Sequence, residues 1–127
     1  MSDNVIVLGL GSNIDPVVNM GRALYLLGKK VKVISVSSFE STRPIGITDQ
    51  PDFLNGAVLI STDMTREQLS IDLKAIEDEM GRDRSLPKYG PRVIDLDIII
   101  WNGEIVNNDF YERDFIRRAV GEVSNSI

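Results

Sequence analysis

The sequence contains neither cysteine nor histidine. Without cysteine the protein forms no disulfide, holds no zinc through thiolates and uses no thiol nucleophile. Without histidine, no imidazole serves as general base, metal ligand or phosphate carrier. Any chemistry must therefore come from carboxylates, arginine, lysine, hydroxyls and amides, together with a metal ion taken from solution.

Long hydrophobic runs, low-complexity segments and internal repeats are absent as well. No apolar stretch approaches the length of a membrane span, and no basic segment followed by an apolar one indicates secretion. The 127 residues, 43% hydrophobic and 26% charged, suit one compact domain over residues 1–127. We therefore expect a cytoplasmic protein with no membrane partner. The net charge of −5 argues against a nucleic-acid partner.

Hydrophobic periodicity and turn residues predict alternating strands and helices. The predicted strands are residues 5–8, 31–39, 53–62 and 94–101, with a short strand at 105–106 after the hairpin signal Asn102-Gly103. The predicted helices are residues 15–28, 65–80 and, in the tail, 111–123, and residues 40–52 and 81–91 are expected as loops. This order is the ferredoxin-like split β-α-β-β-α-β arrangement. We therefore predict an α+β fold, with a mostly antiparallel sheet, two helices on one face and loops on the other.

Two helix starts are marked by their own residues. Asp15 precedes Pro16, as an N-cap residue precedes proline at the first helical position. Thr65 and Gln68 have the spacing of a capping box, in which each side chain accepts a backbone hydrogen bond from the other residue. We expect helices to begin at both places.

Two carboxylates interrupt the most apolar predicted strand, at Asp95 and Asp97. Successive side chains of a strand point to opposite faces, so the two carboxylates share one face and the neighbouring apolar residues take the other. Adjacent like charges repel, and Mg²⁺ bound to one or two carboxylates and to substrate phosphates relieves that repulsion. The alternative is an ordinary strand end at which arginine or backbone donors neutralise both carboxylates.

The predicted loop before this strand carries four cations, Arg82, Arg84, Lys88 and Arg92. One guanidinium group can donate two hydrogen bonds to a phosphate group. Charge stabilisation is most of what phosphoryl transfer requires of a protein. Beside a magnesium site, such a loop is suited to binding a polyphosphate. The alternative is a solvated basic loop whose cations pair with the acidic residues 77–79.

Phe53 and Asn55 stand two residues apart on a predicted strand and therefore on one face. An aromatic ring beside a carboxamide can stack on a flat heterocycle and hydrogen-bond to its edge. The alternative is a core phenylalanine followed by a strand-end asparagine.

Gly9-Leu-Gly11 follows a predicted strand and precedes a predicted helix, as a dinucleotide-binding motif does. The third glycine of that motif would fall at position 14, which is isoleucine, so the motif is not present. We expect a tight polar turn here.

Several separate motifs, in order and at matching spacings, resemble one family. They are Gly11-Ser-Asn13, Ser38-Phe-Glu-Ser-Thr42, Pro44-Ile-Gly46, Asp49-Gln-Pro-Asp-Phe-Leu-Asn55, Glu77, Gly81-Arg82, Arg84 and Tyr89-Gly-Pro-Arg-Val-Ile-Asp-Leu-Asp97. Over residues 5–106 the chain is similar to 6-hydroxymethyl-7,8-dihydropterin pyrophosphokinase. The resemblance implies Mg²⁺-dependent transfer of pyrophosphate from ATP to the pterin hydroxymethyl group in folate biosynthesis, with release of AMP.

The resemblance also implies roles for individual residues. Asp95 and Asp97 would bind two Mg²⁺ ions, and Arg82 and Arg92 would stabilise the transferring group. The implied pterin-binding residues are Thr42, Ile45, Phe53, Asn55 and Phe115. The implied nucleotide-binding residues are Lys74, Glu77, Arg84, Tyr89, Ile98 and Arg113.

The chain departs from this family after residue 106. The usual Pro-His-Pro segment, whose histidine contacts the nucleotide, is missing, and residues 109–118 stand in its place. Loss of one such contact typically costs about 1–3 kcal/mol. We therefore expect an active enzyme with a weakened affinity for ATP, in which Tyr111 or Arg113 replaces part of the missing contact.

Two other classes of function remain open. One is a catalytically weak or inactive relative that binds pterin or nucleotide, and the other is a non-enzymatic ferredoxin-like binding module. We expect a monomer, although a shortened C-terminus that exposes a sheet edge would favour a dimer.

Overall fold

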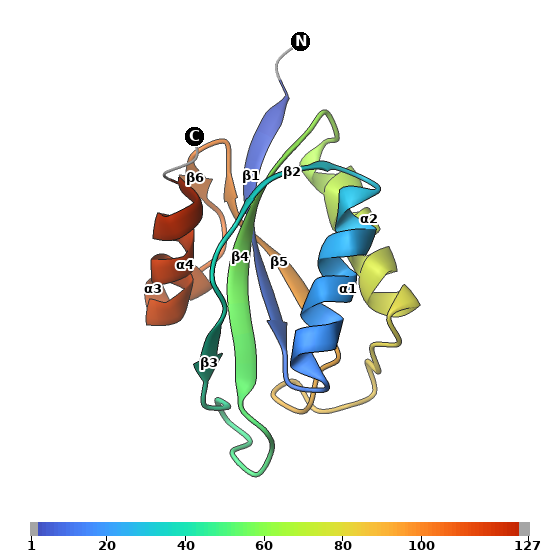
Figure 1. The fold of residues 1–127 in the computed structure, drawn as a ribbon, viewed down its shortest axis with the longest axis vertical. Coiled ribbons are helices and arrows are strands. Elements are labelled where there is room, and N and C mark those ends of the chain that lie inside the picture. The colour runs from blue at the N-terminus through green and yellow to red at the C-terminus, as the bar shows by residue number, and fades with distance from the viewer. Residues whose placement is uncertain (1–2, 125–127) are drawn as a thin grey trace.

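The computed structural model describes residues 3–124, which form a six-stranded sheet with helices on both sides (Figure 1). The strands are β1 (Asn4–Ser12), β2 (Lys32–Val36), β3 (Glu40–Thr42), β4 (Phe53–Thr62), β5 (Asp95–Trp101) and β6 (Glu104–Ile105). The helices are α1 (Pro16–Gly28), α2 (Arg66–Glu79), α3 (Asp109–Glu112) and α4 (Asp114–Ser124). Among the described residues, no helix is long and apolar enough to cross a bilayer.

The order of the strands in the sheet is β2-β4-β1-β5-β6, and β3 pairs with β4 on the same edge as β2. Each of these pairings is antiparallel. β1 therefore lies between β4 and β5, which are far apart in the sequence. This topology confirms the predicted α+β, ferredoxin-like fold.

The larger hydrophobic core lies between the sheet and the helices α1 and α2. Met20 and Leu27 of α1 and Leu69 of α2 are fully buried there, together with Ile6 and Leu8 of β1. Burial of each such side chain contributes about 1.5–3 kcal/mol relative to leaving it exposed. This face of the sheet therefore supplies most of the apolar burial of the fold.

Both predicted helix starts are found, with different chemistry. At α2 the capping box is complete, since the Gln68 N–H donates to Thr65 Oγ1 at 3.2 Å and the Thr65 N–H donates to Gln68 Oε1 at 2.9 Å. At α1, Pro16 is the first helical residue, but the Asp15 side chain makes no capping hydrogen bond and its φ is 45°. The position of this start was predicted correctly, and the side-chain cap was wrong.

β1 runs through the glycine-containing segment in which we expected a turn. Gly9 and Gly11 pair with β4 on one side and stand opposite Asp97 and Asp95 of β5 on the other. A Cβ on Gly11 would lie 2.9 Å from Asn55 Oδ1, so any other residue here would force the Asn55 side chain to move. The predicted turn is wrong because pairing with two neighbouring strands outweighs the low strand propensity of glycine.

The loop predicted over residues 40–52 is wrong for its first three residues, which form β3 on the edge of β4. A strand of three residues shows no period of its own. The predicted hairpin is present, because Asn102 and Gly103 both adopt positive φ values, 48° and 83°, between β5 and β6.

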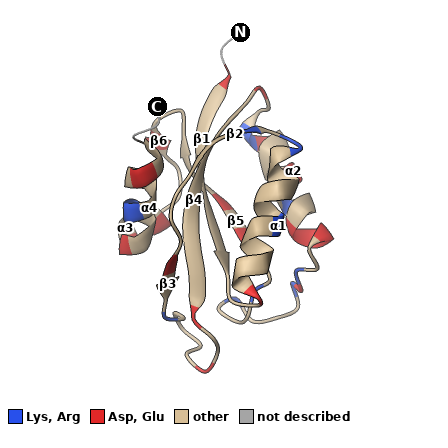
Figure 2. Ribbon diagram, viewed as in Figure 1, with Lys and Arg blue, Asp and Glu red and all other residues tan. Residues whose placement is uncertain are grey.

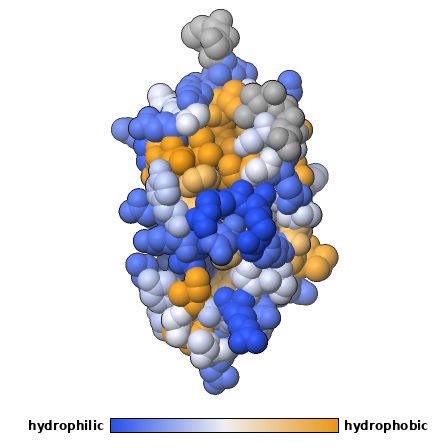
Figure 3. All heavy atoms as spheres, turned by 90° about the vertical axis from the view of Figure 1, so that its left-hand side faces the viewer, coloured by the Kyte–Doolittle hydropathy of each residue, from blue (hydrophilic) through white to orange (hydrophobic). Residues whose placement is uncertain are grey.

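The second face of the sheet is partly covered, whereas we had predicted helices on one face only. Figure 1 shows α3 and α4 on the opposite side of the sheet from α1 and α2. Val120 and Val123 of α4 pack on Val7, Leu59 and Ile99 in a smaller core. One tail helix was predicted over residues 111–123, but Arg113 is extended and divides the tail into α3 and α4, and the position of these helices on this face was not predicted. Figure 3 views this side of the molecule, where hydrophilic side chains gather in the middle with apolar ones exposed above them.

Charged residues lie mostly on the helices and loops. Figure 2 shows β1 and β4 largely without charge, whereas the start of β5 is acidic. A charged segment inside an apolar sheet is unfavourable unless it is paired or binds a ligand. The start of β5 is therefore the place at which to look for a site.

Candidate active site

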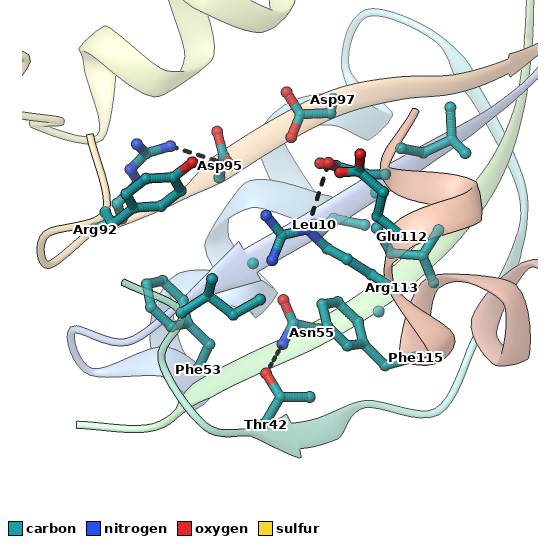
Figure 4. Close-up of a pocket in the computed structure, with 18 of the residues that line it drawn as sticks. Leu10, Thr42, Phe53, Asn55, Arg92, Asp95, Asp97, Glu112, Arg113 and Phe115 are labelled. Atoms are coloured by element: carbon teal, nitrogen blue, oxygen red, sulfur yellow. Dashed lines mark hydrogen bonds and ion pairs between the residues drawn. The ribbon is translucent and has the colours of Figure 1, made fainter. Parts of the chain in front are cut away.

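A cavity of about 460 Å³ opens on the second face of the sheet, beside α4 (Figure 4). Its lining comes from β1, β3, β4, β5, α3, the start of α4 and two loops, residues 43–52 and 81–92. Its volume lies in the range of small-molecule binding sites, about 300–1,000 Å³. We call the end at Asp95 and Asp97 of β5 the carboxylate end. We call the end at Thr42 of β3 and at Phe53 and Asn55 of β4 the aromatic end.

Asp95 and Asp97 project from β5 into the carboxylate end, as the strand alternation predicts (Figure 4). They stand opposite Gly11 and Gly9 of β1, so no β1 side chain lies directly beside them in the sheet. Burial, followed by the nearby Asp95 carboxylate, raises the pKa of Asp97 to about 7. Near neutral pH this end of the cavity therefore favours a bound proton or cation.

Two arginines of the 81–92 loop contact Asp95. Arg82 Nη1 lies 3.1 Å from Asp95 Oδ1, and Arg92 Nη1 lies 3.3 Å from Asp95 Oδ2. Arg82 Nη1 also lies 2.8 Å from Oε1 of the buried Glu77, whose Oε2 accepts a hydrogen bond from the Leu96 N–H. The guanidinium groups are therefore held at the carboxylate end.

The carboxylate pair is suited to a divalent cation. Within residues 3–124 the arginine ion pairs involve Asp95 and not Asp97, so neutralisation of both carboxylates by arginine is not found. The same residues contain no group of three acidic, cysteine or histidine side chains that could hold a metal alone. Mg²⁺ is commonly bound by one or two carboxylates together with substrate phosphates. The donor set fits Mg²⁺ that binds with a phosphate ligand.

At the aromatic end, Phe53 and Phe115 lie on either side of Asn55 (Figure 4). Asn55 Nδ2 donates to Thr42 Oγ1 at 2.6 Å, which fixes the orientation of the amide. Ile45 lines the same cavity. This arrangement can hold a flat ring between two aromatic faces, with a fixed amide at its edge.

One buried asparagine connects the two loops of the cavity. Asn13 Nδ2 donates to Gln50 Oε1 at 2.8 Å, and Asn13 Oδ1 accepts from the Arg92 N–H at 2.8 Å. Gln50 Nε2 in turn donates to Tyr89 O at 2.6 Å. The 43–52 loop, next to the aromatic end, is thereby linked to the 81–92 loop, which carries the arginines.

The structure brings most of the predicted site residues together. Those that line the cavity are Arg82, Arg92, Asp95, Asp97, Thr42, Ile45, Phe53, Asn55, Phe115, Tyr89 and Arg113. Four of the implied nucleotide-binding residues are not part of this lining: Lys74, Glu77, Arg84 and Ile98. Tyr111 does not line it either and is 64% exposed, so of the two residues expected to replace the missing contact only Arg113 lines the cavity.

The four residues outside the lining have other surroundings. Lys74 is exposed on α2, and Ile98 packs against the larger core, on the opposite face of β5 from Asp97. Arg84 Nη2 lies 3.1 Å from Glu77 Oε1 and also pairs with an acidic neighbour on α2, as expected for a solvated basic loop. In this structure, the side chains of Lys74, Arg84 and Ile98 do not reach the cavity.

The cavity also contains charged residues that the sequence reasoning missed. Asp109 and Glu112 of α3 line it, and Arg113 Nε lies 3.4 Å from Asp109 Oδ1. Arg43 lines it as well. Asp109 and Glu112 lie beyond the quoted family motifs, which end at Asp97, so no motif marked them. For Arg43, the only available signal was its place directly after Thr42.

Comparisons with known proteins agree with these features. A family model described as 7,8-dihydro-6-hydroxymethylpterin-pyrophosphokinase matches residues 7–125. The chain is 32% identical over 131 residues to 2-amino-4-hydroxy-6-hydroxymethyldihydropteridine pyrophosphokinase of Haemophilus influenzae, covering 94% of this chain and 81% of the relative. The protein of the same name from Bacillus subtilis is 35% identical over 136 residues, covering 98% of this chain and 81% of the relative.

A longer relative contains a segment similar to most of this chain. The mitochondrial folate synthesis bifunctional protein of Pisum sativum is 38% identical over 124 residues, covering 90% of this chain and 24% of the relative. The similarity therefore extends to a protein in which the matching segment is one part of a larger chain.

Proposed function

This chain belongs to the 7,8-dihydro-6-hydroxymethylpterin-pyrophosphokinase family, and we propose that it transfers pyrophosphate from ATP to the hydroxymethyl group of 6-hydroxymethyl-7,8-dihydropterin, releasing AMP, in folate biosynthesis. One observation carries the proposal: a carboxylate pair, two arginines and an aromatic slot with an amide open into one cavity. The carboxylates suit a metal bound to phosphate, the arginines suit the transferring group, and the slot suits a flat heterocycle.

The aromatic end would bind the pterin. Phe53 and Phe115 would stack on the two faces of the ring, and Asn55 would hydrogen-bond to its edge. The hydrogen bond from Asn55 to Thr42 supports this role, because it holds the amide in one orientation before the substrate arrives. The reaction then requires the hydroxymethyl group to point toward the carboxylate end.

The carboxylate end would bind the phosphates of ATP. Asp95 and Asp97 would hold Mg²⁺, two ions in our proposal, and the raised pKa of Asp97 supports a cation at this position. When bound, Mg²⁺ neutralises phosphate oxygens and orients them for in-line attack. Arg82 and Arg92, already beside Asp95, would stabilise the charge on the transferring group. Transfer of this kind needs no protein nucleophile, which suits a chain without cysteine or histidine.

Arg113 and Tyr89 are the proposed contacts to the remainder of the nucleotide, because both line the cavity. The missing Pro-His-Pro segment and the positions of Lys74 and Ile98 leave fewer such contacts. We therefore propose that this enzyme binds ATP weakly, and that Arg113→Ala weakens the binding further. Titration of ATP at saturating dihydropterin measures both effects.

AMP release tests the proposed reaction. We expect AMP only when ATP, the dihydropterin and Mg²⁺ are all present, and little AMP from Asp95→Asn or Asp97→Asn. Asp63→Asn, at an exposed residue directly after β4, is the matched control and should leave the rate unchanged. Pterin or nucleotide binding without AMP release would indicate a non-catalytic relative. Absence of any pterin or nucleotide binding would contradict the proposed reaction.

We also propose that the protein acts as a cytoplasmic monomer. The surface that a dimer would use is the edge strand β2, on which Ile34 and Val36 are 41% and 42% exposed. Light scattering over a range of concentrations tests the monomer, and cell fractionation tests the location. A mass of two chains at low protein concentration would contradict the proposed monomer.

A further inference from the structure

α4 is attached to the segment before and within β3 by two pairs of side chains. Arg118 of α4 donates from both Nε and Nη2 to the Glu40 carboxylate, at 2.9 Å and 2.6 Å. Glu122, one turn later, accepts hydrogen bonds from the Ser38 N–H at 3.1 Å and the Ser38 hydroxyl at 2.9 Å. We call these two pairs the α4–β3 clamp.

Both sides of the clamp lead directly to the aromatic end of the cavity. Phe115 lies one turn before Arg118 on α4, and Thr42 ends the strand that begins with Glu40. Thr42 in turn accepts the hydrogen bond that orients Asn55. Figure 4 shows Phe115 and Thr42 converging on Asn55.

α4 also makes apolar contacts with the sheet. Ala119, Val120 and Val123 pack into the smaller core. Hydrophobic contact is non-directional, so it holds the helix against the sheet without fixing its position along the strands. A guanidinium and a carboxylate that share two hydrogen bonds fix both distance and orientation. The clamp therefore supplies the directional contact between α4 and β3.

We propose that Glu40, Arg118, Ser38 and Glu122 are positioning residues that set the width of the slot between Phe115 and the strands, and thereby the affinity for the flat heterocycle. Among the described residues these four are not part of the cavity lining, so they act through Phe115 and Thr42. Glu40 and Arg118 are exposed, and exposed pairs contribute little to folding stability. The inference rests on the proposed function, which supplies pterin as the heterocycle.

Steady-state kinetics of Glu40→Ala and Arg118→Ala test the clamp. We expect the KM for dihydropterin to rise roughly threefold, the effect of losing one exposed pair, with unchanged kcat, unchanged KM for ATP and unchanged melting temperature. The double exchange E40R with R118E rebuilds the pair with reversed charges and should return the pterin KM to the wild-type value. Arg22→Ala, on the exposed side of α1, is the matched control and should change nothing.

Three results would overturn the inference: equal rises in the KM values for pterin and ATP, no rise in either, or no recovery in the double exchange. Calorimetry of dihydropterin binding in the presence of a non-hydrolysable ATP analogue distinguishes failure of the clamp proposal from failure of the proposed function. Wild-type protein that binds no pterin contradicts both proposals. Active wild-type protein with unchanged alanine variants contradicts only the clamp.

Discussion

The two faces of the sheet are built by the same strands and differ in what they present. On the face covered by α1 and α2, the strands contribute fully buried side chains such as Ile6 and Ile60. On the other face, α4 covers one part and the rest is a cavity with charged residues of both signs in its lining. β5 shows the contrast within one strand, since Leu96 is buried in the larger core while Asp95 and Asp97 beside it line the cavity.

This difference separates the residues that stabilise the fold from those suited to chemistry. Burial of apolar side chains is favourable, whereas burial of a carboxylate is unfavourable unless it is paired or binds a cation. The raised pKa of Asp97 is a direct consequence of that unfavourable burial. Substitutions on the first face should therefore change stability, and substitutions on the second should change activity.

The largest effect on stability is expected from the face covered by α1 and α2. Ile60→Ala leaves a void in the larger core and should lower the free energy of unfolding by about 2–5 kcal/mol. Ile34→Ala, at an exposed position of β2, should change it by less than about 0.5 kcal/mol. Urea denaturation measures both. A loss below about 1 kcal/mol in Ile60→Ala would contradict the location of the main core.

The largest effect on activity is expected from the cavity face. Asp97→Asn should lower AMP release by at least about a hundredfold, because the metal loses one of its two carboxylates. The same substitution should leave stability at pH 8 equal or higher, because it removes a buried charge from beside Asp95. Turnover and urea denaturation are measured on one preparation. Unchanged turnover, or a large loss of stability, would remove the distinction between the two faces.

A pH dependence should follow from Asp97. Burial raises its pKa from the ordinary value of 3.8 to about 7, so in this range the folded protein binds more protons than the unfolded chain. Without metal, stability should therefore fall as the pH rises from about 4 through about 7. Mg²⁺ must displace the proton, so Mg²⁺ affinity should rise about tenfold between about pH 6 and pH 8.

Calorimetry with Mg²⁺ and a non-hydrolysable ATP analogue measures this affinity. Asp97→Asn is the control, and its stability should lose most of the dependence on pH between about 4 and 7. If the Mg²⁺ affinity of the wild-type protein is the same at about pH 6 and pH 8, Asp97 is not the titrating group.

A smaller effect is expected from the link between the two loops. Asn13→Ala should lower kcat/KM about fivefold, the effect of losing roughly one net hydrogen bond, because Arg92 and Gln50 lose a shared partner. Gln50→Ala should have a similar effect, and the double variant should be little worse than either single one. Losses that simply multiply would show that the two residues act independently.

The sequence predicted those features that depend on near neighbours. The capping box of Thr65 and Gln68 and the turn at Asn102-Gly103 were found as expected, because each depends on a few adjacent residues. The common face of Asp95 and Asp97 was also correct, because it depends only on the period of a strand.

Predictions failed where distant segments decide the structure. The glycines of β1 were expected in a turn, but pairing with β4 and β5 keeps them in a strand. β3 exists because it pairs with β4, which no local pattern could show.

By itself, the sequence determined the types of chemistry open to this protein and the common face of its two central carboxylates, because both follow from residue type and strand geometry. Only the tertiary structure decided what surrounds those carboxylates. It placed Arg82 and Arg92 against Asp95, and it brought Phe115 on α4 to the same cavity as Phe53 on β4. The physical reason is that these arrangements depend on strand pairing and on the packing of α4 against one face of the sheet. Both bring together segments that are far apart in the sequence, and the local pattern of one segment does not show which other segment it will contact.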